Sequence, residues 1–131
     1  MGVPDTGMSP GREPGDGRFD VRESRVGDVA VLTLSGELDH DTAEPLREAL
    51  ARHTGPEAER VVVDLSGLTF CDSTGLNVLL HARLAAHDAG GGVELAGLRP
   101  PVARMFEITG AHTVFRVHAG LDEALARERP A

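Results

Sequence analysis

The stretch RVVVDL at residues 60–65 constrains the fold more than any other part of the chain. It is an uninterrupted β-branched run, whereas a strand with one face in water alternates apolar and polar residues. We therefore expect a central strand that is covered on both sides. The run leads to CDSTG at residues 71–75, after which the apolar spacing becomes helical.

Two further strands are expected before this point. The segments 19–26 and 29–38 are β-rich and are separated by the turn pair Gly27-Asp28, which predicts an antiparallel hairpin whose first strand lies at a sheet edge. The segment 39–53 then has helical spacing, with Thr42 as the predicted N-cap and Pro45 in the first turn.

The second half of the chain alternates helices and strands. A helix begins at Ser73 and ends at the glycines of DAGGG (88–92), and its predicted apolar stripe is formed by Leu76, Leu79, Leu80 and Leu84. A strand at 93–97, a helix at 100–109 stopped by Gly110, a strand at 114–120 and a helix at 121–129 follow. The order ββαβαβαβα predicts an α/β fold with a small mixed sheet and about four helices.

Length and charge limit the possible functions. The 131 residues suit one domain, which we expect at 19–131 after a disordered tail at 1–18 that is rich in glycine and proline. No apolar run reaches the ~20 residues that a bilayer requires, and the start lacks the pattern of a signal peptide, so we expect a cytoplasmic protein. The net charge of −8 disfavours direct contact with nucleic acid or membrane surfaces and favours a protein partner.

Catalysis by the CDSTG segment is weakly supported. A serine hydrolase would present G-x-S-x-G, but Cys71 stands where the first glycine belongs. Cys71 itself lacks basic neighbours in sequence that would lower its pKa, so we expect a buried thiol. We therefore predict no catalytic residue.

A helix cap is the plainest role for the polar residues of this segment, since Asp and Ser lead the N-cap ranking. Either Asp72 or Ser73 could cap the helix. A hydroxyl at a helix start is also accessible to a kinase, and the free N–H groups and helix dipole there would accept a phosphate.

Metal and cofactor sites are not indicated. The six histidines lack the spacing of a metal motif, and we interpret them as scattered surface or turn residues. The segment GELDHD at 36–41 lacks the alternating ligands of a calcium loop, so Asp39 and Asp41 are expected at a helix start. We expect neither a metal nor a cofactor.

Three segments, taken together, resemble one family in order and spacing. They are LSGELDHDTAEPLREAL, VVVDLSGLTFCDSTGLNVLL and VARMFEITG, and they are similar to the STAS-domain anti-sigma factor antagonists of bacteria. The resemblance covers roughly residues 20–128. It implies a small mixed sheet with helices and a regulator that is not an enzyme.

The resemblance also implies partners and a switch. Such a protein binds an anti-sigma factor that is a serine kinase of the histidine-kinase-like ATPase type, and thereby frees a sigma factor. The kinase phosphorylates the position of Ser73, and a serine phosphatase reverses the modification. Asp72, Thr74 and Gly75 fall in the family's phosphorylation motif, and Asp39 falls in its docking loop.

Parallel strands bring both helix starts to the same sheet edge. We therefore expect the docking surface to combine the residues around two helix starts, which are Asp39, His40, Thr42, Asp72, Thr74, Gly75, Leu76 and Asn77. Two other interpretations remain open: an unphosphorylated STAS scaffold or lipid-transport subunit, and a hydrolase that uses Ser73.

Overall fold

A computed structural model describes residues 18–54 and 60–126 of the chain. Most of the predicted tail therefore lies outside the described residues, although Arg18 lies within them. The observed order ββαβαβαβα is the predicted one, with one short 3-10 turn added. The elements are β1 Phe19–Val26, β2 Val29–Leu38, α1 Ala43–Ala51, β3 Arg60–Cys71, α2 Ser73–Asp88, β4 Gly92–Ala96, α3 Pro100–Thr109, η2 Ala111–Thr113, β5 Val117–His118 and α4 Leu121–Ala126.

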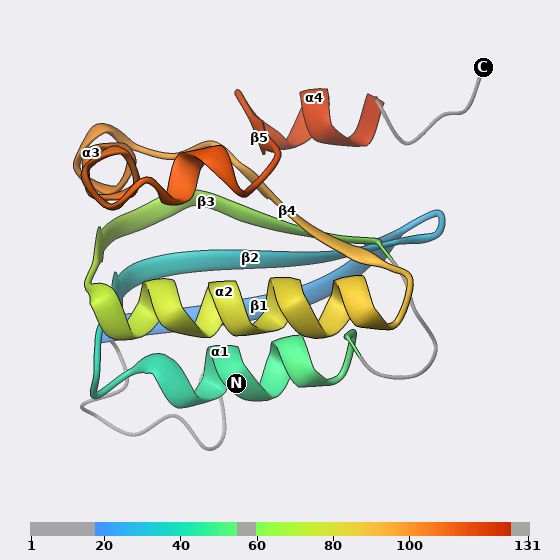
Figure 1. The fold of residues 1–131 in the computed structure, drawn as a ribbon, viewed down its shortest axis with the longest axis horizontal. Helices are drawn as coiled ribbons and strands as arrows, with labels where there is room; N and C mark the ends of the chain where they lie inside the picture. Colours follow the sequence, from blue (N-terminus) through green and yellow to red (C-terminus); the bar gives the residue numbers. More distant parts are fainter. Residues whose placement is uncertain (1–17, 55–59, 127–131) are drawn as a thin grey trace, which may run out of the picture.

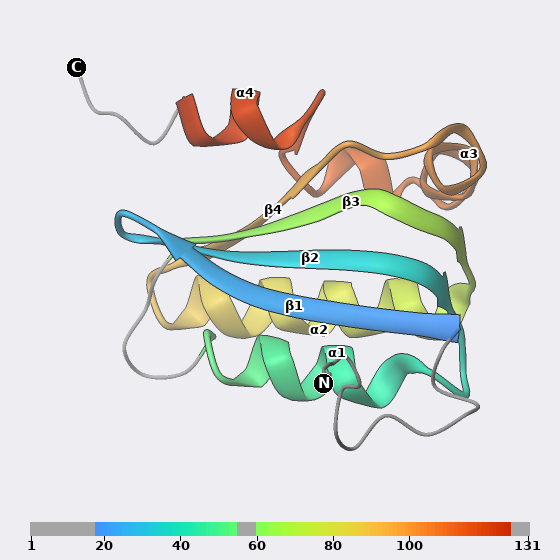
Figure 2. The ribbon, with the colours of Figure 1, turned by 180° about the vertical axis from the view of Figure 1, so that it is seen from behind.

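The five strands form one mixed sheet in the order β1-β2-β3-β4-β5 (Figure 1). β1 and β2 pair antiparallel, and each later strand is parallel to its predecessor. The predicted hairpin is confirmed, and β1 lies at the sheet edge (Figure 2). The run at residues 60–65 forms the first half of β3, the middle strand, as its continuous apolar pattern predicts.

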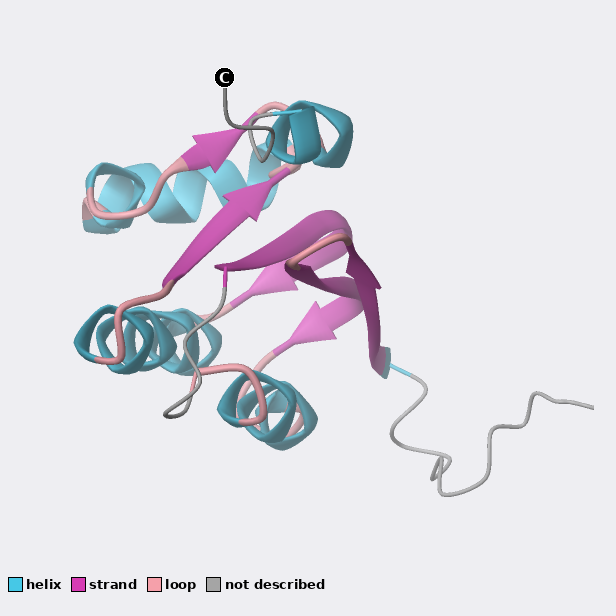
Figure 3. Cartoon of the chain, turned by 90° about the vertical axis from the view of Figure 1, so that its right-hand side faces the viewer, coloured by secondary structure: helices cyan, strands magenta, loops and turns pink. Residues whose placement is uncertain are grey.

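Helices cover both faces of the sheet, with α1 and α2 on one side and α4 on the other (Figure 3). Successive residues of β3 contribute to the cores on opposite faces of the sheet. Val61 and Val63 belong to the larger core, together with side chains of α1, α2 and α3, whereas Val62 belongs to a smaller cluster with Ala124 of α4. The side chains of Val61, Val62 and Val63 are fully buried, which explains why three consecutive residues of the run are apolar.

Two details of the predicted pattern are wrong. The last strand was expected over 114–120, but β5 contains only Val117 and His118, because the chain first makes the turn η2 and buries Phe115 against Phe106. Leu84 was expected on the apolar stripe of α2, yet it is 54% exposed. The buried side of α2 instead continues through the small residues Ala82 and Ala86.

Candidate functional site

The predicted docking region lies where β2 and β3 end beside each other. Leu38 and Cys71, the last residues of the two strands, pair in register. The amide of Asp72 donates to the carbonyl oxygen of Leu38 at 3.1 Å, so the pairing continues into the turn before α2. As parallel topology requires, the β2–α1 loop and the start of α2 meet at the same sheet edge.

Asp72 connects these two segments through its carboxylate. Oδ1 accepts a hydrogen bond from the amide of Gly75 at 3.1 Å and thereby caps α2. Oδ2 accepts from the amide of His40 in the β2–α1 loop at 3.2 Å. The sequence left the cap open between Asp72 and Ser73; the structure assigns it to Asp72, and Ser73 is the first helical residue.

Gly75 is required by close packing at the helix start. A Cβ atom at this position would lie 2.6 Å from Cγ of Leu38 and 3.1 Å from Sγ of Cys71. Such a contact with the Leu38 side chain is shorter than packed atoms tolerate. The absence of a side chain at Gly75 therefore lets α2 sit directly on the ends of β2 and β3.

The turn before α1 is organised by Asp39. Its Oδ1 accepts from the amides of Asp41 and Thr42, at 2.9 and 3.1 Å, and from the hydroxyl of Thr42 at 3.1 Å. Thr42 occupies the N-cap position of α1 as predicted, but its side chain makes no capping hydrogen bond there. Its single hydroxyl proton is shared between Oδ1 of Asp39 and the carbonyl oxygen of Glu37, which lies 2.9 Å away, and Thr42 is buried beneath the turn.

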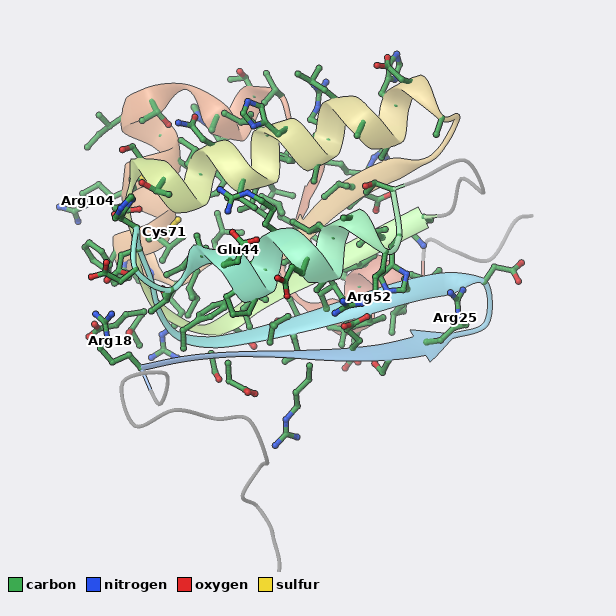
Figure 4. All side chains as sticks on the ribbon, turned by 90° about the horizontal axis from the view of Figure 1, so that it is seen from below. Arg18, Arg25, Glu44, Arg52, Cys71 and Arg104 are labelled. Carbon is green, nitrogen blue, oxygen red and sulfur yellow. The ribbon has the colours of Figure 1, made fainter. Side chains whose placement is uncertain are left out.

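Arg18 also contributes to this turn, although sequence reasoning placed it in the tail. Its Nη1 donates to Oδ2 of Asp39 at 3.0 Å. Figure 4 shows Arg18 and Cys71 at the same end of the molecule. The pairing of Phe19 with Gly36 brings Arg18 to this end, a register that the predicted hairpin could have indicated. Gly36 adopts φ +95° there, and a Cβ atom on it would meet the Arg18 carbonyl oxygen at 1.9 Å.

The protonation of Asp39 reflects these contacts. Partial burial alone would raise the pKa of its carboxyl group. The hydrogen bonds from Thr42 and the Asp41 amide, together with Arg18, outweigh that effect and lower the pKa of Asp39 below its usual value. Asp39 is therefore a negatively charged organiser of the turn, and its side chain is only 18% exposed.

The predicted site residues differ in how far they face solvent. His40, Ser73 and Asn77 are exposed, and so is Asp41 in the β2–α1 loop. Asp39, Asp72 and Thr74 are partly exposed, whereas Thr42, Gly75 and Leu76 are buried. The buried residues hold the surface in place, and only the others are available to a partner in the observed conformation.

Two residues near the site need separate notice. Phe70 is 48% exposed at the end of β3, where it pairs in register with Glu37, and sequence reasoning had not singled it out. Cys71 is buried as expected. Burial, and then the negative charge of Asp72, raise the pKa of its thiol to about 12, so it remains protonated and is a poor nucleophile.

The histidines are not all surface or turn residues, which corrects the expectation. His118 is buried, and its Nε2 lies 2.8 Å from Oε1 of Glu94. Nε2 of His53 lies 3.0 Å from Oε1 of Glu23.

Within residues 18–54 and 60–126, no group of three histidine, cysteine, aspartate or glutamate side chains could hold a metal ion. In that same part of the chain, no helix is both long and apolar enough to span a membrane.

Comparison with known proteins agrees with this architecture. The family model described as "Mlab, STAS domain" matches residues 21–126. The anti-sigma F factor antagonist of Paenibacillus polymyxa is 33% identical over 94 residues, which cover 69% of this chain and 78% of that protein. The chain therefore belongs to the STAS-domain family of anti-sigma factor antagonists.

Solved structures have the same fold. An anti-sigma factor antagonist from Mycobacterium paratuberculosis matches with a TM-score of 0.75 and 26% identity, covering 83% of this chain and 92% of that one. The phosphorylated form of SpoIIAA, a cell fate determinant of Bacillus, matches with a TM-score of 0.68 and 23% identity, covering 84% and 100%. The five-stranded mixed sheet and its helices are thus the family's architecture.

Proposed function

We propose that this protein is an anti-sigma factor antagonist that binds an anti-sigma factor and thereby releases a sigma factor. The anti-sigma factor would be a serine kinase of the histidine-kinase-like ATPase type, which phosphorylates Ser73, and a serine phosphatase would reverse the modification. The protein would act in the cytoplasm, without catalysis of its own and without binding nucleic acid or a membrane. The names of the relatives support the antagonist role.

The observation that carries the proposal is the position of Ser73. It is exposed at the first position of α2, directly after the capping residue Asp72. The exposed residue His40 is linked to the same site through the carboxylate of Asp72. An accessible hydroxyl beside a preformed two-segment surface suits a residue that is modified by the protein it docks with.

Phosphorylation at Ser73 would act as an off-switch. The phosphate would add about −1.5 to −2 charges beside Asp72. The start of α2 can accept a phosphate, so the fold would persist. A partner surface without a matching cation would have to desolvate the phosphate uncompensated, at a cost of several kcal/mol, or roughly 100-fold in affinity.

A fold relative supports this type of regulation, since SpoIIAA has been solved in a phosphorylated form. The direct test is intact mass after incubation with ATP and candidate ATPase anti-sigma factors. Wild type should gain one phosphate, and Ser73→Ala should gain none. One phosphate on Ser73→Ala would indicate that Thr74 is the acceptor. No phosphate on either protein would contradict the proposed phosphorylation switch.

Intact mass together with an esterase assay separates the alternatives. An unphosphorylated scaffold would gain no mass with any kinase, and a Ser73 hydrolase would show ester turnover that Ser73→Ala abolishes. The hydrolase interpretation has little support, because the residue two positions before Ser73 is Cys71, not the glycine of G-x-S-x-G, and burial raises the pKa of that thiol.

The docking surface needs its own variants. Asp39 lies in the expected docking loop, but it holds the turn together, so Asp39→Arg would disturb folding as well as binding. Asn77→Arg is a cleaner probe, because Asn77 is exposed on the first turns of α2. It should weaken partner binding at least ~10-fold. The control His87→Arg, exposed in the last turn of α2, should leave affinity unchanged; equal losses would place the interface elsewhere.

A further inference from the structure

The carboxylate of Asp72 is shared between the modified helix and the neighbouring loop. One oxygen holds the amide of Gly75 in α2, and the other holds the amide of His40 in the β2–α1 loop. We propose that Asp72 is a positioning residue that transmits phosphorylation of Ser73 to His40. The inference rests on the proposed function for its biological use, but it concerns a contact within this chain.

A phosphate on Ser73 would act on Asp72 in two ways. It would place a second, larger negative charge next to the carboxylate, and like charges repel. It would also supply oxygens that compete for the amides at the start of α2, where anions bind. Both effects drive the Asp72 carboxylate away from the Gly75 amide. Because both oxygens belong to one planar group, a displacement that breaks the Gly75 contact also distorts the hydrogen bond from the His40 amide.

Loss of the hydrogen bond between Asp72 and His40 should affect only one part of the β2–α1 loop. The amides of Asp41 and Thr42 donate to Asp39, not to Asp72, and the Thr42 hydroxyl is anchored on Glu37. Loss of the Asp72 contact would therefore free His40 while the turn beneath it stays formed. Phosphorylation would change both halves of the docking surface, the helix start by its charge and the loop by release of His40.

The test uses the full chain with phosphoserine incorporated at position 73 during translation, so that no kinase or partner is needed. Amide hydrogen exchange of His40 is followed by NMR. We expect phosphorylation to speed this exchange roughly 5- to 10-fold, the effect of losing one ordinary intramolecular hydrogen bond. The amides of Asp41 and Thr42 should exchange at unchanged rates and serve as internal controls.

The Asp72→Asn variant separates transmission from a general loosening of the site. Asparagine is as good an N-cap as aspartate, so α2 should keep its start. Its side chain keeps one acceptor oxygen for the Gly75 amide, and its NH2 group, a donor, then faces the His40 amide and cannot accept from it. His40 should therefore exchange fast already without phosphate, and phosphorylation of this variant should add less than about twofold.

Two results would overturn the proposal. One is unchanged His40 exchange on phosphorylation of the wild-type sequence. The other is an acceleration in Asp72→Asn as large as in the wild type, which would show that the phosphate reaches the loop by another route. The proposed function can fail separately. If His40 exchange responds as expected but no ATPase partner phosphorylates the chain, the coupling through Asp72 stands and the proposed phosphorylation switch does not.

Discussion

Asp39 and Glu94 are two carboxylates with nearly equal exposure and very different partners. Their side chains are 18% and 17% exposed. Asp39 accepts mainly from the amides and hydroxyl of its own turn, at most three residues away. Glu94 accepts from Arg60, 34 residues away, with two hydrogen bonds of 2.8 Å, and contacts His118, 24 residues away.

The electrostatics of the two sites share a pattern. Burial would raise the pKa of Glu94, but hydrogen bonds and charge from Arg60 and His118 lower it. Arg60 also donates to the carbonyl oxygen of Ala124 in α4, so the Glu94 cluster joins β3, β4, β5 and the last helix. A lowered pKa therefore does not reveal which parts of the chain a carboxylate connects. Asp39 stabilises a local turn, whereas Glu94 connects distant segments.

The largest expected effect is therefore at Glu94. Glu94→Ala leaves Arg60 and the buried His118 without their shared acceptor and should lower the free energy of unfolding by about 3 kcal/mol, measured by urea denaturation. The control is Glu44→Ala, which removes an exposed ion pair with Arg47 on α1 and should cost under ~1 kcal/mol. Equal decreases in the free energy of unfolding would contradict the view that Glu94 stabilises the fold by connecting distant segments.

The pH dependence sharpens the same contrast. Because the pKa of Glu94 is lowered in the folded protein, its stabilisation is fully present above the ordinary glutamate pKa and is lost as pH falls through the folded-state value. The difference in unfolding free energy between wild type and Glu94→Gln should thus be largest near pH 7 and shrink at acidic pH. A difference that grows on acidification would contradict the assignment.

Packing beneath the docking surface should matter next. Gly75→Ala would force a methyl group against Leu38 and Cys71 and should destabilise the fold by about 1–3 kcal/mol, although alanine is the better helix former. Gly92→Ala is the control, since a Cβ atom there would meet nothing within 4 Å. A stabilised Gly75→Ala protein, seen as a raised melting temperature, would mean that α2 can shift freely.

Asp39 should show a smaller loss than Glu94. Asp39→Ala removes the acceptor of the turn and should cost about 1–2 kcal/mol, as loss of a helix cap does. Asp41→Ala, at a side chain that is 76% exposed, should change stability by less than ~0.5 kcal/mol. Thermal melts of both variants at neutral pH compare them; a neutral Asp39→Ala would show that Thr42 alone holds the turn.

Ser73→Ala should have the smallest effect on folding. Asp72 supplies the cap, so loss of the Ser73 hydroxyl should change the free energy of unfolding by less than ~0.5 kcal/mol. Chemical denaturation beside the wild type measures it. A loss near 1 kcal/mol would give Ser73 a structural role and would complicate its use as a test of phosphorylation.

Much of this architecture could be read from local pattern. The continuous run in β3, the turn after β1 and the glycine after α3 predicted element types and order, and the resemblance indicated the family. The predictions weakened where a tertiary contact overrides the local preference. Residues 114–116 have strand-like composition but lie outside β5, because Phe115 turns inward to pack against Phe106.

The site divides in the same way. The sequence alone placed Asp72 and Ser73 at a helix start, because capping depends on neighbours within a few residues. Asp39 was also expected at a helix start, but it lies in the turn before α1, which begins at Ala43. Only the tertiary structure decided that Asp72 rather than Ser73 is the cap, that Asp72 also holds His40, that Arg18 reaches Asp39, and that Glu94 joins Arg60 and His118. Those contacts join residues 21 to 34 positions apart, apart from the cap itself, and their partners are set by strand register, which no short window of sequence contains.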